Sequence, residues 1–335
     1  MIGWSEFHTP NLKGGSETGD EVNEKALAWL RKNATNENYY MHINYWDTHR
    51  CYNMDSSWAD RFADYPVTQP WPDEDAIAKH QSHDGAFTAN RQFKDSKSWV
   101  DLMPGAVQNR DDFEHMITGY DASIAYVDAH VKEVLDELAA QGVLDEAVII
   151  FSSDHGDAFG EHGIYSDHVC VDECIHHIPL IVRWPGVTPA GGDCDSFMLN
   201  VDYAPTICSM LGCVDLPEKW DGKSYAENLQ GRDGEDRDYL VWDSSLYTVQ
   251  RAVRTKQHLY IRTYDCNDYN CFAPVELFDM VKDPNQTTNL AGDQPALVEK
   301  LQEKMDDWVR QQQSTGLGNP DPIFETIKER GRTPT

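Results

Sequence analysis

Hydrophobic residues recur at two different spacings along the chain, and the two spacings predict different elements. From Asp112 to Leu138 they return every three or four residues, which predicts a long amphipathic helix that ends at Gly142. The same spacing predicts shorter helices over 19–32 and 297–310. Continuous apolar or aromatic runs instead predict strands, over 39–46, 147–152 and 178–184. A strand, a helix and a strand in this order predict parallel packing, with helices on the faces of the sheet.

The strand predicted over 147–152 leads into the most informative residues of the sequence. Asp154 and His155 follow it, and Gly156 comes next. Ligands of open α/β sheets bind beyond the carboxyl ends of the strands, so this pair stands where chemistry is expected. A carboxylate beside an imidazole is a suitable half-site for a divalent cation. The sequence therefore predicts half of a metal site here, in preference to a simple turn or capping pair.

The chain changes character after about residue 216. Short strands separated by turn residues, over 239–242, 247–254 and 259–263, predict an antiparallel sheet. We therefore expect three regions: an N-terminally incomplete α/β domain over 1–215, an antiparallel α+β subdomain over 216–312 and a polar tail over 313–335. The α/β domain contains an irregular insertion over 64–110, where no hydrophobic period is sustained.

Composition narrows the class of partner. The 28 basic and 57 acidic residues give a formal charge of −29, which repels nucleic acid and anionic membranes at long range. The acidic residues are dispersed, which favours a solubilising surface over an acidic recognition surface. No apolar run reaches the ~20 residues that a membrane-spanning helix needs. The first residues do not resemble a signal peptide, and this alone suggests a cytoplasmic location.

The eight cysteines include no Cys-x-x-Cys pair. Cys170 and Cys174, which precede two histidines, allow a zinc cluster. Their spacing of four residues places them on one face of a helix, however, and favours buried structural thiols. Cys266 and Cys271 flank a turn-like segment, so a local disulfide between them is an open alternative.

A set of segments spread along the chain is recognisable as a whole. They are Tyr120–Asp128, Asp154-His155-Gly156, Gly160-Glu161-His162-Gly163, Ile178–Gly186, Val201–Ile207, Glu276–Pro284 and Asn289-Leu290-Ala291. Together they resemble the sulfatase branch of the alkaline phosphatase superfamily, over roughly residues 21–310. The resemblance implies a mixed sheet flanked by helices, with a small antiparallel C-terminal subdomain. It also implies metal-dependent hydrolysis of sulfate esters, with an aryl or carbohydrate sulfate as substrate.

The resemblance implies a metal site that contains Asp154 and His155. These two residues match the later pair of metal ligands of the family. The implied cation is Ca²⁺, with Mg²⁺ or Mn²⁺ as alternatives. Such a cation withdraws negative charge from a sulfuryl oxygen and orients the nucleophile.

Two further histidines match positions that contact the substrate in the family. His49, in the run His49-Arg50-Cys51-Tyr52, matches a histidine that contacts sulfate and handles protons, although a cysteine stands where the family has proline. His168 stands where many relatives have a sulfate-binding lysine. It is either the acid that protonates the leaving oxygen or a structural residue. His162 and His177 are expected to be structural.

One family motif is missing from the sequence. The family's nucleophile is a cysteine or serine in a Cys/Ser-x-Pro-x-Arg motif, which active sulfatases convert to formylglycine. No such motif is present, so formylglycine is not encoded here. The early strand that ends in paired metal-binding aspartates has no counterpart either. We therefore expect the 335-residue chain alone to have negligible activity on an aryl sulfate.

Three interpretations of this chain stay open. The first is a sulfuric ester hydrolase whose missing front is supplied by another chain or by a longer product. The second is an inactive remnant that binds metal or a partner. The third is a phosphodiesterase of the same superfamily. The identity of the nucleophile in the missing region would distinguish this interpretation from the first.

Overall fold

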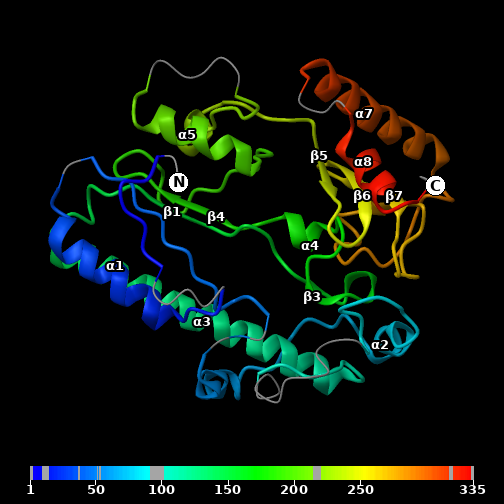
Figure 1. Cartoon of the computed structure of the whole chain (residues 1–335), viewed down its shortest axis with the longest axis horizontal. Helices are drawn as coiled ribbons and strands as arrows, with labels where there is room; N and C mark the ends of the chain where they lie inside the picture. Colours follow the sequence, from blue (N-terminus) through cyan, green and yellow to red (C-terminus); the bar gives the residue numbers. More distant parts are fainter. Residues whose placement is uncertain are drawn as a thin grey trace. The chain divides into compact units, whose positions relative to one another are not determined.

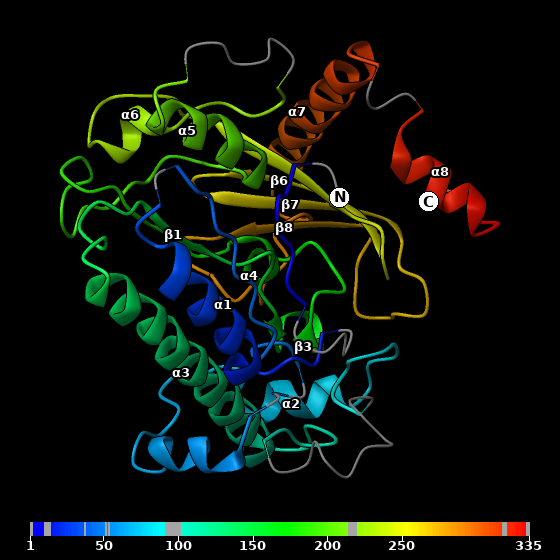
Figure 2. The same ribbon diagram turned by 60° about the vertical axis from the view of Figure 1, so that its left-hand side comes forward.

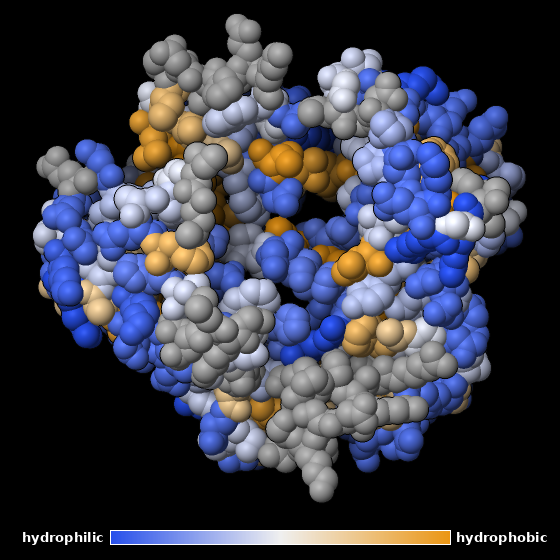
Figure 3. Space-filling view, in the orientation of Figure 1, coloured by the Kyte–Doolittle hydropathy of each residue, from blue (hydrophilic) through white to orange (hydrophobic). Residues whose placement is uncertain are grey.

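The computed structural model describes residues 3–9, 15–36, 38–50, 52, 54–90, 102–213, 220–316 and 320–332. The chain divides into two compact units, residues 1–147 and 148–335. Figure 1 shows the order of their helices and strands. Hydrophilic side chains cover most of the face seen in Figure 3, in keeping with the charge of −29. No helix among the described residues is long and apolar enough to cross a membrane.

The first unit is built from helices. They are α1 (Gly19–Asn33), the 3₁₀-helix η1 (Ser56–Phe62), α2 (Glu74–His80) and α3 (Arg110–Ala140). α1 and α3 lie side by side in both ribbon views (Figures 1 and 2), and Leu30 packs with Leu138 between them. A capping box starts α1, because the Thr18 hydroxyl accepts from the Glu21 N–H and the Glu21 carboxylate accepts from the Thr18 N–H. Both long helices confirm the hydrophobic spacing, and Gly142 follows α3 with a φ of +73°.

The strand predicted over 39–46 is wrong. This segment is irregular, and the described part of the first unit contains no strand with which it could form a ladder. Side chains hold it instead: the Tyr45 hydroxyl donates to Asn23 Oδ1 at 2.6 Å, and Asp47 Oδ1 accepts from the Gly19 N–H at 3.1 Å. A run of aromatic residues favours a pleated surface, but a strand exists only where a neighbour takes up its backbone hydrogen bonds.

Between residues 64 and 109, the described part of the expected insertion contains α2 and is otherwise irregular. Residues 91–101 lie outside the described part of the chain. The insertion ends at Arg110, where the guanidinium donates to the carbonyl oxygens of Pro72 and Gln69. These two bonds attach the irregular segment to the start of α3.

The second unit begins with two short strand pairs. β1 (Ile149–Ser152) pairs with β4 (Leu180–Arg183), and β2 (Ala158–Phe159) pairs with β3 (Tyr165–Asp167). Both pairs are antiparallel, so the prediction of parallel packing is wrong for β1 and β4. The reason lies in the connection. A parallel pair needs a long crossover, usually a helix, whereas residues 153–179 hold a small hairpin and the one-turn helix α4 (Glu173–His176), which return the chain beside itself.

Short helices follow these strands. They are η3 (Glu161–Gly163), η4 (Asn200–Asp202), α5 (Tyr203–Met210) and α6 (Ala226–Leu229). Asp202 is buried and joins this region to the next sheet, because its carboxylate accepts from the Arg237 guanidinium at 2.7 and 2.8 Å. A doubly hydrogen-bonded pair of this kind fixes orientation as well as distance.

The rest of the second unit is a four-stranded antiparallel sheet. Its strands are β5 (Tyr239–Ser244), β6 (Val249–Thr255), β7 (His258–Asp265) and β8 (Val275–Asp279), in that order across the sheet. Three of them confirm the predicted antiparallel sheet, and β8 is an additional strand. α7 (Pro295–Ser314) lies beside this sheet (Figures 1 and 2), and its Leu301 and Met305 are buried in one core cluster with Val253 and Tyr260 of the sheet.

The tail expected over 313–335 contains a further helix, α8 (Pro322–Glu329). Its Ile323 and Ile327 are buried against Val249 of β6. Asp321 caps it by accepting from the Ile323 N–H, and the same carboxylate receives two bonds of 2.9 Å from the buried Arg251 guanidinium. One helical turn of apolar residues is too short a signal to predict a helix from sequence, so the packing and this ion pair decide it.

Candidate functional site

The end of β1 is held in place by close backbone packing. The Gly156 N–H donates to Ile175 O at 2.8 Å. A Cβ atom on Gly156 would lie 2.2 Å from Cys174 O, so only glycine fits at this position. The Ser152 hydroxyl donates to Pro179 O at 2.9 Å and lies 2.8 Å from the Tyr203 hydroxyl. The residues between Ser152 and Gly156 are therefore carried on a fixed turn.

Asp154 and His155 occupy this turn. The Asp154 side chain is 85% exposed, and its Oδ1 accepts from the His155 backbone N–H at 3.0 Å. Asp154 Oδ2 lies 4.0 Å from His155 Nε2. His155 Nδ1 lies 2.9 Å from Gly156 O, and the imidazole is half-buried. The predicted pair thus lies together at a strand end, facing solvent rather than the hydrocarbon core.

His168 lies against His155. The two imidazole rings stack with centroids 3.9 Å apart and planes 24° apart. His168 follows β3, and its backbone N–H donates to Asp167 Oδ1 at 2.7 Å. The same oxygen lies 3.4 Å from His168 Nδ1, and the Asp167 side chain is fully buried. The structure therefore brings together three of the four residues that the sequence selected.

The sequence analysis missed Asp157. One ligand atom each of His155, Asp157 and His168 lies within 4.8 Å of the others, so these residues form a group able to hold a metal ion. The β2–β3 hairpin explains the meeting: Ala158 pairs with Asp167, so the antiparallel register places Asp157 opposite His168. The sequence does show a second acidic residue, Asp157, two positions after His155. Only the register of the hairpin reveals that this residue lies close to His168.

His49 belongs to the first unit. It is exposed, its Nδ1 lies 3.1 Å from Arg50 O, and its ring meets the Trp46 ring edge-on with centroids 5.9 Å apart. Cys51, the departure from the family's His-x-Pro-Tyr pattern, lies outside the described residues. The role of His49 therefore stays a prediction.

His162 is structural, as expected. It is buried between two carboxylates, with Asp172 Oδ2 at 2.7 Å and Glu276 Oε1 at 3.0 Å. Burial alone would lower the pKa of His162, but the charges of Asp172 and Glu276 raise it well above its usual value. A buried imidazolium thus joins η3 to β8. His177 is largely exposed and lies 3.7 Å from the Glu173 carboxylate.

The cysteines of this unit are free thiols. Cys170 is buried and Cys174 half-buried, and burial raises the pKa of both well above the ordinary value. Protonated thiols bind zinc poorly, which favours the structural interpretation of this pair. Cys266 and Cys271 are also free, so the local disulfide considered from sequence is not formed.

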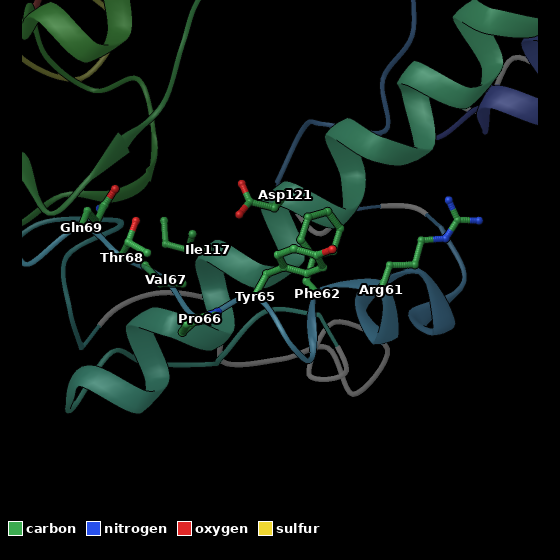
Figure 4. Close-up of a pocket in the computed structure, with 9 residues that line it drawn as sticks. All are labelled: Arg61, Phe62, Tyr65, Pro66, Val67, Thr68, Gln69, Ile117 and Asp121. Atoms are coloured by element: carbon green, nitrogen blue, oxygen red, sulfur yellow. The ribbon is translucent and has the colours of Figure 1, made fainter.

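A separate cavity of about 510 Å³ lies in the first unit (Figure 4). Its lining comes from the end of η1, from the segment after it and from α3: Arg61, Phe62, Tyr65, Pro66, Val67, Thr68, Gln69, Ile117 and Asp121. Burial raises the pKa of Asp121. Figure 4 shows its carboxylate above the two aromatic rings, while Arg61 points away. No residue selected from the sequence lines this cavity.

Comparison with known proteins finds matching family models and similar proteins. The sulfatase family model matches residues 5–213, and a second model, N-sulphoglucosamine sulphohydrolase, C-terminal, matches residues 160–314. An N-acetylglucosamine-6-O-sulfatase of Bacteroides thetaiotaomicron is 28% identical over 225 residues, which are 65% of this chain and 39% of that protein. A choline-sulfatase of Rhizobium meliloti is 31% identical over 176 residues, covering 51% and 32%. The chain thus spans less than half the length of these relatives.

Solved structures show the same fold. One, described as a complex with its substrate D-glucosamine-2-N,6-O-disulfate, has a TM-score of 0.72 and 20% identity, covering 91% of this chain and 71% of that chain. A phosphonate monoester hydrolase of Agrobacterium radiobacter has a TM-score of 0.67 and 22% identity, covering 88% and 62%. The likeness confirms the predicted alkaline phosphatase type of α/β fold with its antiparallel C-terminal sheet.

Proposed function

The chain belongs to the sulfatase family, and from this premise we propose that it carries the cation-binding and leaving-group side of a sulfate ester hydrolase. The observation that supports this most directly is the meeting of Asp154, His155 and His168 at the end of β1. Two imidazoles and an exposed carboxylate at a strand end can hold a cation and handle a proton beside an anionic group.

The family implies a divalent metal, and the described residues include a group that can hold one. When bound, the metal draws negative charge from the sulfuryl oxygens. Asp154 and His155 would hold it. The calcium that the resemblance implies does not fit the described donors, because Ca²⁺ takes six to eight oxygen ligands and this group is rich in imidazole nitrogen.

The protein's own residues then have these roles. The family resemblance gives His49, a residue of the first unit, contact with the sulfuryl group and a part in proton handling, and this role stays a prediction. In this proposal His168 protonates the departing alcohol oxygen. The fixed turn between Ser152 and Gly156 keeps Asp154 and His155 oriented, so that the site does not reorganise as charge develops.

We assign the substrate to the sulfated carbohydrates. Two relatives in the comparison are named for such sugars or polysaccharides: the N-acetylglucosamine-6-O-sulfatase and an ulvan-active sulfatase of Formosa agariphila, which is 30% identical over 200 residues. The strongly negative surface of this chain repels anions, so a sulfated sugar needs a local positive centre, which a bound cation supplies.

Binding of a sulfated sugar tests the proposal. We expect the full chain with a divalent ion to bind D-glucosamine-2-N,6-O-disulfate, but not glucosamine, in a calorimetric titration. Asp154→Asn should weaken this binding at least about tenfold, the loss expected for one charged contact. Asp193→Asn, at an exposed acid of the same unit, serves as the control. Equal binding of both sugars, or no effect of Asp154→Asn, would contradict the proposal.

Sulfate release by the same chain tests whether the nucleophile lies outside these residues. The sequence has no Cys/Ser-x-Pro-x-Arg motif, so turnover should stay at background. Turnover that Asp154→Asn abolishes would show that these 335 residues contain a nucleophile. It would refute the proposal that the chain carries only the cation-binding and leaving-group side of the active site.

A further inference from the structure

We propose that Cys208 and Cys213, at the C-terminal end of α5, form a disulfide by exchange with a disulfide of the glutathione class. The structure shows both residues as free thiols, which is the reduced state of this pair. The inference goes beyond the proposed function, because it concerns the covalent modification of two thiols that do not belong to the turn at the end of β1.

The backbone at the end of α5 brings the two residues together. The Cys213 N–H donates to Cys208 O at 2.9 Å, and the Gly212 N–H donates to Ser209 O at 3.1 Å. Gly212 has a φ of +73°, in the left-handed region. These two hydrogen bonds and this conformation make a Schellman motif, in which the side chains at the positions of Cys208 and Cys213 commonly meet in an apolar contact. In this chain both positions are cysteines.

The two side chains are in contact. The Cys208 S–H donates a hydrogen bond to the Cys213 sulfur. Two cysteines can be bridged without backbone movement only where their side chains point toward each other, with Cβ atoms about 3.5–4.5 Å apart. The contact between the thiols meets the first condition, and the tight turn of the Schellman motif favours the second. Rotation of the two side chains therefore brings the sulfur atoms to bonding distance.

Exposure sets the order of the exchange. Cys213 is exposed and Cys208 is half-buried, and burial together with the neighbouring Cys213 raises the pKa of Cys208. Cys213 therefore loses its proton first, and its thiolate attacks one sulfur of glutathione disulfide. A mixed disulfide forms, and one glutathione leaves as a thiolate that takes up a proton.

Cys208 completes the exchange. It loses its proton and attacks the Cys213 sulfur of the mixed disulfide, so the Cys208–Cys213 bond forms and the second glutathione leaves as a thiol. In total the protein gives up two electrons and two protons, and one glutathione disulfide is reduced to two glutathione molecules.

Other described cysteines are less suited to this exchange. Cys170 and Cys174 are surrounded by protein, and burial raises the pKa of both well above the ordinary value. Burial likewise raises the pKa of Cys271. A buried thiol that stays protonated is a poor nucleophile, so these residues react slowly. Cys194 is exposed and provides an internal control.

Peptide mapping of the oxidised chain tests the proposal. Trypsin cuts after Arg183 and Lys219 and releases one peptide, 184–219, which contains Cys194, Cys208 and Cys213. The folded full chain is incubated with oxidised glutathione, and the remaining thiols are then alkylated. We expect this peptide to lose two hydrogen atoms and to carry one alkyl group, and reduction before alkylation should restore three. Three alkyl groups after oxidation, or a disulfide in the peptide that contains Cys271 instead, would overturn the proposal.

Variants identify the pair. Cys208→Ser removes the second thiol of the exchange, so glutathione should stay attached to Cys213 and no internal disulfide should form. Cys194→Ser is the matched control and should still lose two hydrogen atoms. Circular dichroism confirms that both variants are folded. An internal disulfide that survives Cys208→Ser, or that disappears with Cys194→Ser, would show that the pair is wrongly assigned.

Hydrogen exchange measures the effect on the helix end. Closing the short loop 208–213 restricts its opened state by about 40-fold in the chain-entropy model. We therefore expect oxidation to slow amide exchange at Leu211, Gly212 and Cys213 by at least about tenfold, and to leave exchange in α7 unchanged. Cys208→Ser should show no such slowing. Equal exchange at these amides before and after oxidation of the wild type would contradict a bond that closes this turn.

Discussion

Replacing Gly156 by alanine tests whether the turn at the end of β1 is held by close packing. The new Cβ would lie 2.2 Å from Cys174 O and 3.3 Å from Cys174 C. A normal contact is longer by about 1 Å, so the backbone on one side must move by that amount. The Gly156 N–H bond to Ile175 O, now 2.8 Å long, would stretch with it.

The magnitude follows from these two effects. Overpacking of a tight site costs about 1–3 kcal/mol, and the weakened hydrogen bond adds roughly 0.5–1.5 kcal/mol. We therefore expect Gly156→Ala to lower the free energy of unfolding by about 1.5–4.5 kcal/mol. It should also weaken the cation-dependent binding of D-glucosamine-2-N,6-O-disulfate, because Asp154 and His155 sit on the displaced turn.

Urea unfolding followed by circular dichroism measures the first effect, and the calorimetric titration with the sulfated sugar measures the second. Gly292→Ala is the matched control, since a Cβ there meets nothing within 4 Å. That variant should unfold like the wild type or slightly later, because alanine restricts the unfolded chain. If Gly156→Ala unfolds together with Gly292→Ala, the turn is not held as described and the reasoning is refuted.

Two further predictions concern buried ion pairs of the second unit. His162→Gln leaves the carboxylates of Asp172 and Glu276 without their cation and should cost about 3–5 kcal/mol. Because the folded pKa of His162 is raised, its contribution is complete below the unfolded value near 6.5 and is lost as pH rises through the folded pKa. Urea midpoints from pH 6 upward should thus fall in the wild type and stay flatter in His162→Gln, with the exposed His177→Gln as control; parallel curves would contradict this. Arg251→Met leaves the Asp321 cap unpaired, so amide hydrogen exchange in α8 should accelerate strongly. Arg310→Met, at an exposed arginine, should leave exchange in α8 unchanged, and equal exchange in the two variants would show that the ion pair does not hold the helix.

Several features were determined by residues close together in sequence. The spacing of apolar residues specified α3, because its heptad-like period depends only on helix geometry. Short β-branched runs between turn residues specified the antiparallel sheet of β5 to β7 in the same way. Asp154 and His155 could be selected as a site because they follow β1 directly. The family resemblance rested on segments of this kind.

Other features depended on contacts between residues far apart in sequence. The aromatic run over 39–46 forms no strand, because a strand needs a neighbouring ladder that the run itself cannot supply. β1 and β4 run antiparallel because the connection between them contains no long crossover helix. Asp157 reaches His168 only through the register of a two-strand hairpin, and register depends on pairing rather than on local periodicity. The sequence alone thus determined the three long helices α1, α3 and α7 and the strand-end pair, while tertiary pairing decided which side chains join that pair in one site.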